Sequence, residues 1–290
     1  MIGVFVFIFG AIIGSFLTVC AYRIPLSRAD IREEIKEMEE EKENFRKVPK
    51  LPDNFSQDLS ISSPARSFCP KCGATLSFWQ NIPIISWFLL RGRCHYCKEK
   101  IPFRYPLTEI LTAFFALGSY YYFGFSLAFF IAFFILCILW VITLIDYDYY
   151  IIPNTLTYPS IAAGLICSWA NGRWHFLPVP FCQNITESLI GLVVGAGFLL
   201  LISEAFRLIR GKIGLGMGDI KLLAVTGVFF GYQGSFVTIF IGSVLGTLIG
   251  VALVLFKIQK AGHYLPFGPF LAAANAFYIF YGAHPLVISF

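Results

Sequence analysis

Charged side chains are scarce in this chain, and acidic ones are scarcest in its last two thirds. Charged residues make up 13% of the 290 residues, whereas hydrophobic residues make up 57%. Soluble domains are nearer a quarter charged, so this composition excludes a soluble globular protein and predicts a polytopic membrane protein. The mean hydropathy of +0.73 agrees with that class. After residue 105 the acidic residues are Glu109, Asp146, Asp148, Glu187, Glu204 and Asp219.

Long apolar runs dominate the rest of the sequence. A helix of about 20 apolar residues crosses a bilayer. The first run has no basic residues ahead of it and no small-residue cleavage site behind it, which excludes a signal peptide and favours a retained helix. The runs predict eight transmembrane helices, near 2–21, 107–123, 125–145, 155–170, 187–206, 220–232, 234–256 and 268–285.

Basic residues indicate how these helices are oriented. Of 22 Lys and Arg residues, 15 lie between residues 22 and 106, six lie in or beside the loops after the fifth and seventh spans, and only Arg173 falls on the other side. By the positive-inside rule the basic side is cytoplasmic and both termini lie outside. The net charge of +5 therefore reflects topology. Nucleic-acid binding is not expected, because basic motifs interleaved with aromatic residues are missing.

This pattern predicts an all-α membrane protein in three parts. Residues 1–22 form the first transmembrane helix, 23–106 a small cytoplasmic domain, and 107–290 a seven-helix membrane core. Within the cytoplasmic part, residues 30–47 are almost wholly charged, with Glu–Lys pairs at helical spacing. A solvated helix or a flexible insert accounts for that composition.

Four cysteines in the cytoplasmic part form two CxxC pairs. Cys69 and Cys72 are separated from Cys94 and Cys97 by 21 residues. Each pair suits a tight turn that places two thiolates on one tetrahedral ion, so the pattern predicts a structural zinc site with a closed shell. A redox pair or unligated thiols are the alternatives, and His95 is a less favoured substitute ligand. A reducing compartment argues against structural disulfides.

Asp146 and Asp219 lie where long apolar runs meet short polar loops. A carboxylate at the membrane edge costs free energy unless it is paired, hydrated or used, so both are candidate functional residues. Solvation is the ordinary explanation, and it suits Asp148 better than Asp146. Asp219 could simply cap the helix expected to begin at Ile220.

Three glycines at positions 214, 216 and 218 favour a functional role for Asp219, because a cap needs no such backbone freedom. A nucleotide-binding glycine loop is the rival interpretation, but no strand is expected before the glycines, and Lys212 lies on the wrong side of them for a P-loop.

The chain resembles the type IV prepilin peptidases over nearly its whole length. Asp146 is followed seven residues later by Pro153 and then Asn154, and Gly216 to Asp219 reads GxGD, as in that family. The cysteine cluster resembles its zinc-binding cytoplasmic domain. Further matching segments are Gly14–Pro25, Asn81–Trp87, Leu90–Cys94, Arg104–Glu109 and Pro266–Pro269.

The resemblance implies an aspartic endopeptidase of the bacterial cytoplasmic membrane. Asp146 and Asp219 would be catalytic, with Asp148, Pro153, Gly216 and Gly218 supporting the active-site loops. The substrates would be type IV prepilins or type II secretion pseudopilins, cut after a glycine at the cytoplasmic membrane edge. The family also methylates the new N-terminus with S-adenosylmethionine, but no methyl-donor motif is recognisable here.

Three rival functions stay open at this point. A proton-coupled transporter would also place carboxylates among helices, but it predicts internal symmetry and carboxylates nearer mid-span. A non-enzymatic assembly factor would tolerate Asp146→Asn. A presenilin-type protease shares GxGD but leaves the four cysteines unexplained.

Overall fold

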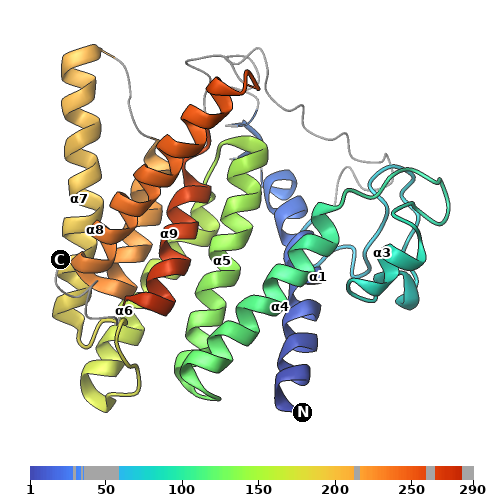
Figure 1. Cartoon of the computed structure of the whole chain (residues 1–290), viewed down its shortest axis with the longest axis horizontal. Helices are drawn as coiled ribbons and strands as arrows, with labels where there is room; N and C mark the ends of the chain where they lie inside the picture. Colours follow the sequence, from blue (N-terminus) through green and yellow to red (C-terminus); the bar gives the residue numbers. More distant parts are fainter. Residues whose placement is uncertain (29–30, 34, 36–58, 212–215, 259–264, 283–290) are drawn as a thin grey trace. The chain divides into compact units, whose positions relative to one another are not determined.

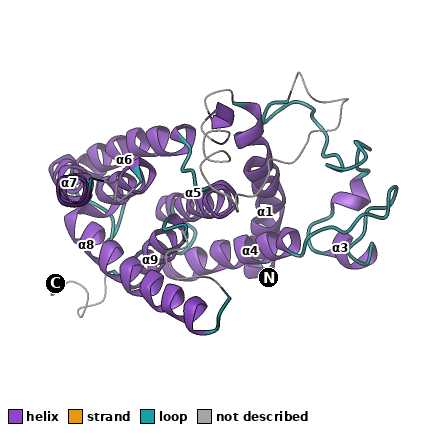
Figure 2. Cartoon of the chain, turned by 90° about the horizontal axis from the view of Figure 1, so that it is seen from above, coloured by secondary structure: helices purple, strands orange, loops and turns teal. Residues whose placement is uncertain are grey.

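The structure is a computed structural model that describes residues 1–28, 31–33, 35, 59–211, 216–258 and 265–282. Within these residues every regular element is a helix, as Figure 2 shows, which confirms the all-α class. The elements in Figure 1 are α1 (Ile2–Ser27), the short 3₁₀ helix η2 (Phe78–Asn81), α3 (Ile85–Leu89), α4 (Arg104–Phe123), α5 (Leu127–Tyr149), α6 (Asn154–Trp174), α7 (Ile185–Arg210), α8 (Met217–Leu255) and α9 (Gly268–Tyr281).

The chain forms two compact units, Met1–Val141 and Ile142–Phe290, and α5 is divided between them. In the first unit α1 and α4 pack closely because small residues line their contact. Gly10 of α1 lies against the backbone of Ala113, and Gly14 lies against the backbone of Glu109. A glycine pair four residues apart lets two membrane helices approach until their backbones touch. The two helices run antiparallel, since residue numbers rise along α1 as they fall along α4.

Residues 59–103 form the remainder of the described first unit. They hold two irregular turns, each with an isolated β-bridge, and the short helices η2 and α3. The charged insert predicted at 30–47 lies outside the described residues except for 31–33 and 35.

The second unit is built around α8, which changes direction at Gly231. This glycine has φ 69° and ψ −171°, outside helical geometry. Ile239, beyond the break, packs against a buried cluster formed by Ile220 and Leu223, before the break, and Leu199 of α7. Two predicted spans, 220–232 and 234–256, meet at this break. Figure 1 shows the two arms of α8 in orange, with α7 and α9 beside them.

Polar side chains satisfy the backbone groups that the break in α8 releases. The hydroxyls of Ser188 and Ser168 donate to the Val228 carbonyl at 2.7 and 3.1 Å. The Cys182 N–H donates to the Phe229 carbonyl at 2.8 Å. An unpaired carbonyl at membrane depth would cost several kcal/mol, so these donors make the break tolerable. Cys182, for which the sequence suggests no partner, is thus a buried part of this packing.

Four helices in the described residues are long and apolar enough to cross a membrane: α1, α5, α7 and α8. The predicted spans near 107–123 and 155–170 are also helical, as α4 and α6. The span near 268–285 corresponds to α9 over its described residues. Cys20 and Cys137 are buried in helices and Cys167 is half-buried, as expected for small apolar side chains.

Candidate functional site

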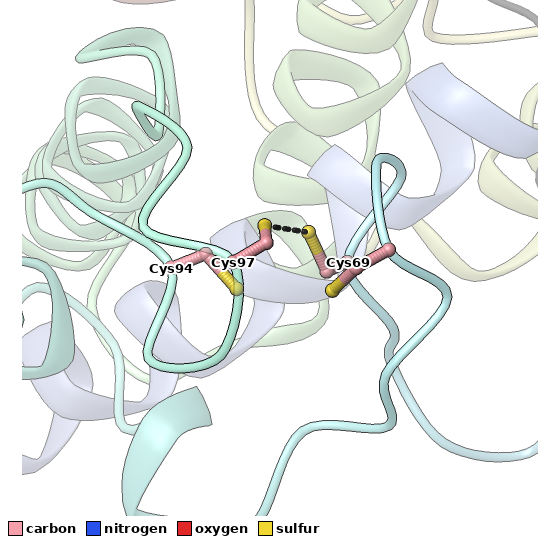
Figure 3. Close-up of side chains that lie close together, drawn as sticks. Cys69, Cys94 and Cys97 are labelled. Carbon is pink, nitrogen blue, oxygen red and sulfur yellow. Dashed lines mark hydrogen bonds between the residues drawn. The ribbon is translucent and has the colours of Figure 1, made fainter.

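The four predicted metal ligands come together in the first unit. The sulfur atoms of Cys69, Cys72, Cys94 and Cys97 all lie within 4.8 Å of one another. Figure 3 marks one contact in the cluster, 3.9 Å between Cys69 Sγ and Cys97 Sγ. Four thiolates about 2.3 Å from one tetrahedral ion would stand about 3.8 Å apart, so the cluster fits such an ion. A disulfide needs about 2.05 Å between the sulfurs, so this pair is not one.

The two CxxC turns share one backbone design at a spacing of 25 residues (94 − 69). In each turn the N–H of the first cysteine donates to the carbonyl five residues later. The residue four positions after that cysteine has positive φ, and its N–H donates to the cysteine's carbonyl. The corresponding bonds are Cys69 to Ala74 and Cys94 to Glu99 at 3.0 and 2.8 Å, and Gly73 to Cys69 and Lys98 to Cys94 at 2.9 and 3.1 Å.

The cysteines differ in burial, which affects their protonation. Cys69 and Cys94 are buried, whereas Cys72 and Cys97 are exposed. Burial raises the pKa of the Cys69 thiol to about 12. Burial acts in the same direction on Cys94, but backbone N–H groups of Cys97 and Tyr96 outweigh it and lower the pKa of Cys94 to about 7. His95 is outside the cluster, and its ring meets Trp79 edge-on at 5.5 Å.

Arg23 organises the chain that leads into the first turn, a role that sequence reasoning missed. Its guanidinium is 3% exposed and donates to the carbonyls of four residues at 2.8 to 3.3 Å. It also lies over the ring of Phe68, 5.5 Å from the centroid. A planar fork with five N–H donors suits such a set of acceptors. The acceptors are Ser60, Ile61, Pro64 and Arg66.

Asp146 lies in the last turn of α5 and is 5% exposed. A helix C-terminus repels an anion. The start of α9 compensates, because the N–H of Gly268 donates to Asp146 Oδ2 at 3.0 Å. Helix N-termini present free N–H groups and favour negative charge, so α9 supplies what α5 lacks.

Asp219 is not the helix cap that its sequence position allows. α8 begins at Met217, earlier than the sequence suggests, and Gly216 is its N-cap residue. Asp219 is therefore the third residue of the helix, and its N–H reaches the Gly216 carbonyl at 3.2 Å. Its carboxylate is close enough to Asp146 for their charges to repel one another.

Ile152 lies between the starts of α8 and α9, in contact with the glycines there. A Cβ on Gly218 would lie 2.9 Å from Ile152 Cβ, and a Cβ on Gly268 would lie 2.6 Å from Asp146 Oδ2 and 3.3 Å from Ile152 Cδ1. Only glycine allows these approaches without displacement. At Gly216 a Cβ would meet Asp219 Oδ2 at 3.5 Å, an ordinary contact. Gly214 lies outside the described residues.

A polar contact joins the starts of α6 and α8 at the same end of the unit. Pro153, which is buried, is the N-cap residue of α6. The next residue, Asn154, accepts a hydrogen bond from Lys221 Nζ at 2.7 Å. Lys221 also lies 5.6 Å from the centroid of the Tyr158 ring. Asn154 belongs to the matching motif, but its sequence position did not indicate Lys221 as its partner.

Asp148 differs from the sequence expectation. Solvation in a loop would explain an ordinary carboxylate there, but α5 continues to Tyr149 and Asp148 is 8% exposed. The helix is longer than predicted because the turn towards α6 occurs only at Tyr150, which has positive φ. Asp148 is thus a buried neighbour of Asp146 in sequence.

These features define a class: a helical membrane protein with a cluster of four thiols that could hold a metal ion and two acidic side chains near helix ends. Residues 8–123 match the family described as Bacterial Peptidase A24 N-terminal domain, and residues 133–251 match the Type IV leader peptidase family. No solved structure matches the chain.

Similar proteins agree over nearly the full length. A prepilin leader peptidase/N-methyltransferase of Pseudomonas putida is 34% identical over 278 residues, which cover 95% of this chain and 89% of that protein. A protein of the same name from Neisseria gonorrhoeae is 35% identical, over 92% of this chain and 86% of its own length. Another from Aeromonas salmonicida is 31% identical, over 96% of this chain and 90% of its own length. The chain belongs to the type IV leader peptidase family. This membership removes the transporter and presenilin-type alternatives.

Proposed function

We propose that this protein is a prepilin leader peptidase that also methylates the new N-terminus, with Asp146 and Asp219 as its catalytic pair. The observation that supports the proposal is that the charge of Asp146 acts on the carboxylate of Asp219 within the second unit. They come from separate helices, and each is held by contacts to glycine-containing loops. The family relatives named for this activity add independent support.

The chemistry follows from the repulsion between the two carboxylates. Neighbouring carboxylates do not both ionise readily, so they share one proton. The ionised partner takes a proton from water, and the protonated partner donates a hydrogen bond to the scissile carbonyl. The Gly268 N–H favours negative charge on Asp146. We therefore assign Asp146 as the base that activates water and Asp219 as the acid.

The substrate in this proposal is a type IV prepilin or a type II secretion pseudopilin. Its basic leader stays in the cytoplasm and its apolar helix lies in the bilayer, so the cut after glycine falls at the membrane edge. Asp146 and Asp219 lie at the ends of apolar helices. We place them, with the cysteine cluster, on the cytoplasmic side of the inner membrane. Eight spans with both termini outside agree with the distribution of basic residues.

We assign zinc to the four cysteines and S-adenosylmethionine to the methylation step. With four thiolate ligands the zinc has no open position, so its role is to hold the two CxxC turns together. S-adenosylmethionine would supply the methyl group to the new N-terminal amine. No residues are assigned to its binding.

Three single variants test the catalytic pair: Asp146→Asn, Asp219→Asn and Asp148→Asn, assayed for leader cleavage of a prepilin in membranes. Loss of cleavage in the first two, with activity kept in the third, is the expected result. The metal content of each purified variant provides a check that the first unit is folded. Full cleavage by either Asp146→Asn or Asp219→Asn would overturn the aspartic mechanism and favour a non-catalytic assembly factor.

A further inference from the structure

Residues 73–90 of the cysteine-bearing segment carry no charged side chain. These 18 residues, from Gly73 to Leu90, contain neither Asp, Glu, Lys, Arg nor His. Basic residues flank them on both sides, with seven Lys and Arg against one acidic residue between positions 59 and 104. A soluble surface segment of this length would ordinarily carry several charges.

The large apolar side chains in this stretch are exposed. Phe78 is 89% exposed, Phe88 59% and Leu89 66%. The helix that carries the last two, α3, buries none of its residues. Several large exposed apolar side chains on one short segment indicate a candidate interaction site.

The contacts of Ile84 show how far along α1 the stretch lies. The Ile84 N–H donates to Glu109 Oε2 of α4 at 2.6 Å. Glu109 in turn packs directly on Gly14 of α1. Gly14 precedes residue 21, the predicted end of the first span, by a helical rise of about 10 Å. The turn at Ile84 therefore lies beside the start of α4, at a level that falls inside the predicted first span. Figures 1 and 2 both show α3 on the same flank of the first unit as α1 and α4.

Glu109 satisfies a backbone turn that would be costly at this depth. Ile84 has φ 64° and ψ −55°, and the Ile85 N–H donates to the Pro83 carbonyl two residues back at 2.6 Å. This is a γ-turn with positive φ, a strained conformation for a β-branched residue. Irregular backbone is tolerated within a bilayer only where protein groups satisfy it. The buried carboxylate of Glu109 does this for the Ile84 N–H.

An apolar cavity separates the stretch from α1. Its volume is about 1020 Å³, and its lining runs along α1 from Phe7 to Val19. On the opposite side it is lined by Phe78, Ile82 and Ile85 among others. The lining on α1 extends into the predicted span, so the cavity lies at membrane depth.

We propose that residues 73–90 are embedded in the bilayer leaflet nearest the C-terminal end of α1, where acyl chains cover Phe78, Phe88 and Leu89 and fill the cavity. The flanking basic residues then lie at the level of anionic headgroups, which attract Lys and Arg near a membrane surface. The occupant is lipid because the surface is uncharged, flanked by positive charge and continuous with a membrane helix. The cysteine-bearing domain is thus partly a membrane-inserted element rather than wholly cytoplasmic. The proposal depends on the membrane location of α1 and not on peptidase activity.

Site-specific photocrosslinking of the full chain tests this. p-Benzoylphenylalanine replaces Phe78 or Phe88 in protein reconstituted into bilayers of phosphatidylcholine, with and without phosphatidylglycerol. Phe5, 72% exposed on α1, is the positive control for lipid contact. Ile61 is the matched control, since it is 45% exposed and its carbonyl is bound by Arg23 at the end of α1. The readout is phospholipid attached to the protein, measured by mass spectrometry after irradiation.

The expected yield of lipid adducts at Phe78 and Phe88 is comparable with that at Phe5 and about tenfold above that at Ile61, because acyl chains contact only side chains inside the hydrocarbon core. Yields at Phe78 and Phe88 as low as at Ile61 would overturn the proposal. Adducts to another protein at these positions, in the native membrane and in place of lipid, would overturn it too. Each variant is also unfolded by heat, and an unfolding temperature equal to that of the wild type confirms that its fold is intact.

Discussion

The two candidate sites differ in how far apart along the chain their residues lie. The four cysteines fall between residues 69 and 97, and the two cysteines of each CxxC pair lie on one turn. The two turns have the same hydrogen-bond pattern. The carboxylate site draws on residues near 146, 219 and 268, at the ends of three helices, and on Ile152 in the segment between α5 and α6. The first site is therefore set by local backbone geometry, and the second by the packing of distant elements.

This difference determines what a single substitution can do. In the cysteine cluster a change removes one ligand, and the remaining thiols cannot close a tetrahedral shell. In the carboxylate site a change outside the reacting groups can shift one loop against another, and a small displacement costs reactivity without removing any catalytic atom.

The largest expected effect is loss of the metal in Cys94→Ser. A structural zinc site contributes roughly 10 kcal/mol or more to folding, so removal of a ligand should abolish retention of the ion in the purified protein. Elemental analysis of zinc per chain is the measurement. Cys167→Ser, in α6 and half-buried, is the matched control and should keep the ion. Zinc at the wild-type ratio in Cys94→Ser would show that the cluster is not its site.

The next effect tests the assembled site through a residue that does no chemistry. Gly268→Ala places a Cβ 2.6 Å from Asp146 Oδ2 and 3.3 Å from Ile152 Cδ1. Displacement of the Asp146 carboxylate by about 1 Å should lower kcat for leader cleavage about 100-fold. Gly197→Ala is the control, because a Cβ there meets no atom within 4 Å. Equal activity in the two variants would contradict the importance of this contact.

How much of each site could be predicted follows from the same contrast. The CxxC spacing alone predicts the metal cluster, because both ligands of each pair lie on one turn. Asp146 and Asp219 were identified as candidates by their rarity and by family resemblance, but no pattern in the sequence brings them together. Gly268 lies in a segment that matches the family, but the sequence gives it no role. Its N–H donates to Asp146, 122 residues away, and no local pattern predicts that contact.

Helix boundaries were predicted less well than helix positions. Asp148 was expected in a loop and Asp219 at a helix cap, yet both lie inside helices that extend a turn further than their apolar runs. Polar residues such as Asp148 end a hydropathy pattern, but buried contacts let the helix continue. The break at Gly231 falls one residue before the predicted end of the span 220–232, so the sequence located the division of α8 to within a few residues.

A smaller effect is expected where Arg23 ties α1 to the first cysteine turn. Arg23→Lys keeps the charge but loses the planar fork that donates to four carbonyls. Leaving buried acceptors unpaired should lower the free energy of unfolding by about 1–3 kcal/mol. Thermal unfolding of the protein in bilayers measures this, and zinc should also be lost faster to a chelator. Arg66→Lys, at an exposed side chain, should match the wild type. A loss equal to that of Arg23→Lys would mean that the effect does not come from the buried hydrogen bonds of Arg23.

The smallest effect compares the two cysteine turns with each other. They place different residues at the same left-handed position, Gly73 with φ 69° and Lys98 with φ 60°. A residue with a Cβ pays about 1 kcal/mol or more there, whereas glycine does not. Lys98→Gly should therefore slow zinc transfer to a chelator by about fivefold, and Gly73→Ala should speed it by a similar factor. Slower zinc transfer in Lys98→Gly together with faster transfer in Gly73→Ala would show that the same backbone geometry governs both turns. Faster transfer in Lys98→Gly would contradict this, because the lysine side chain would then contribute more than its strained backbone costs.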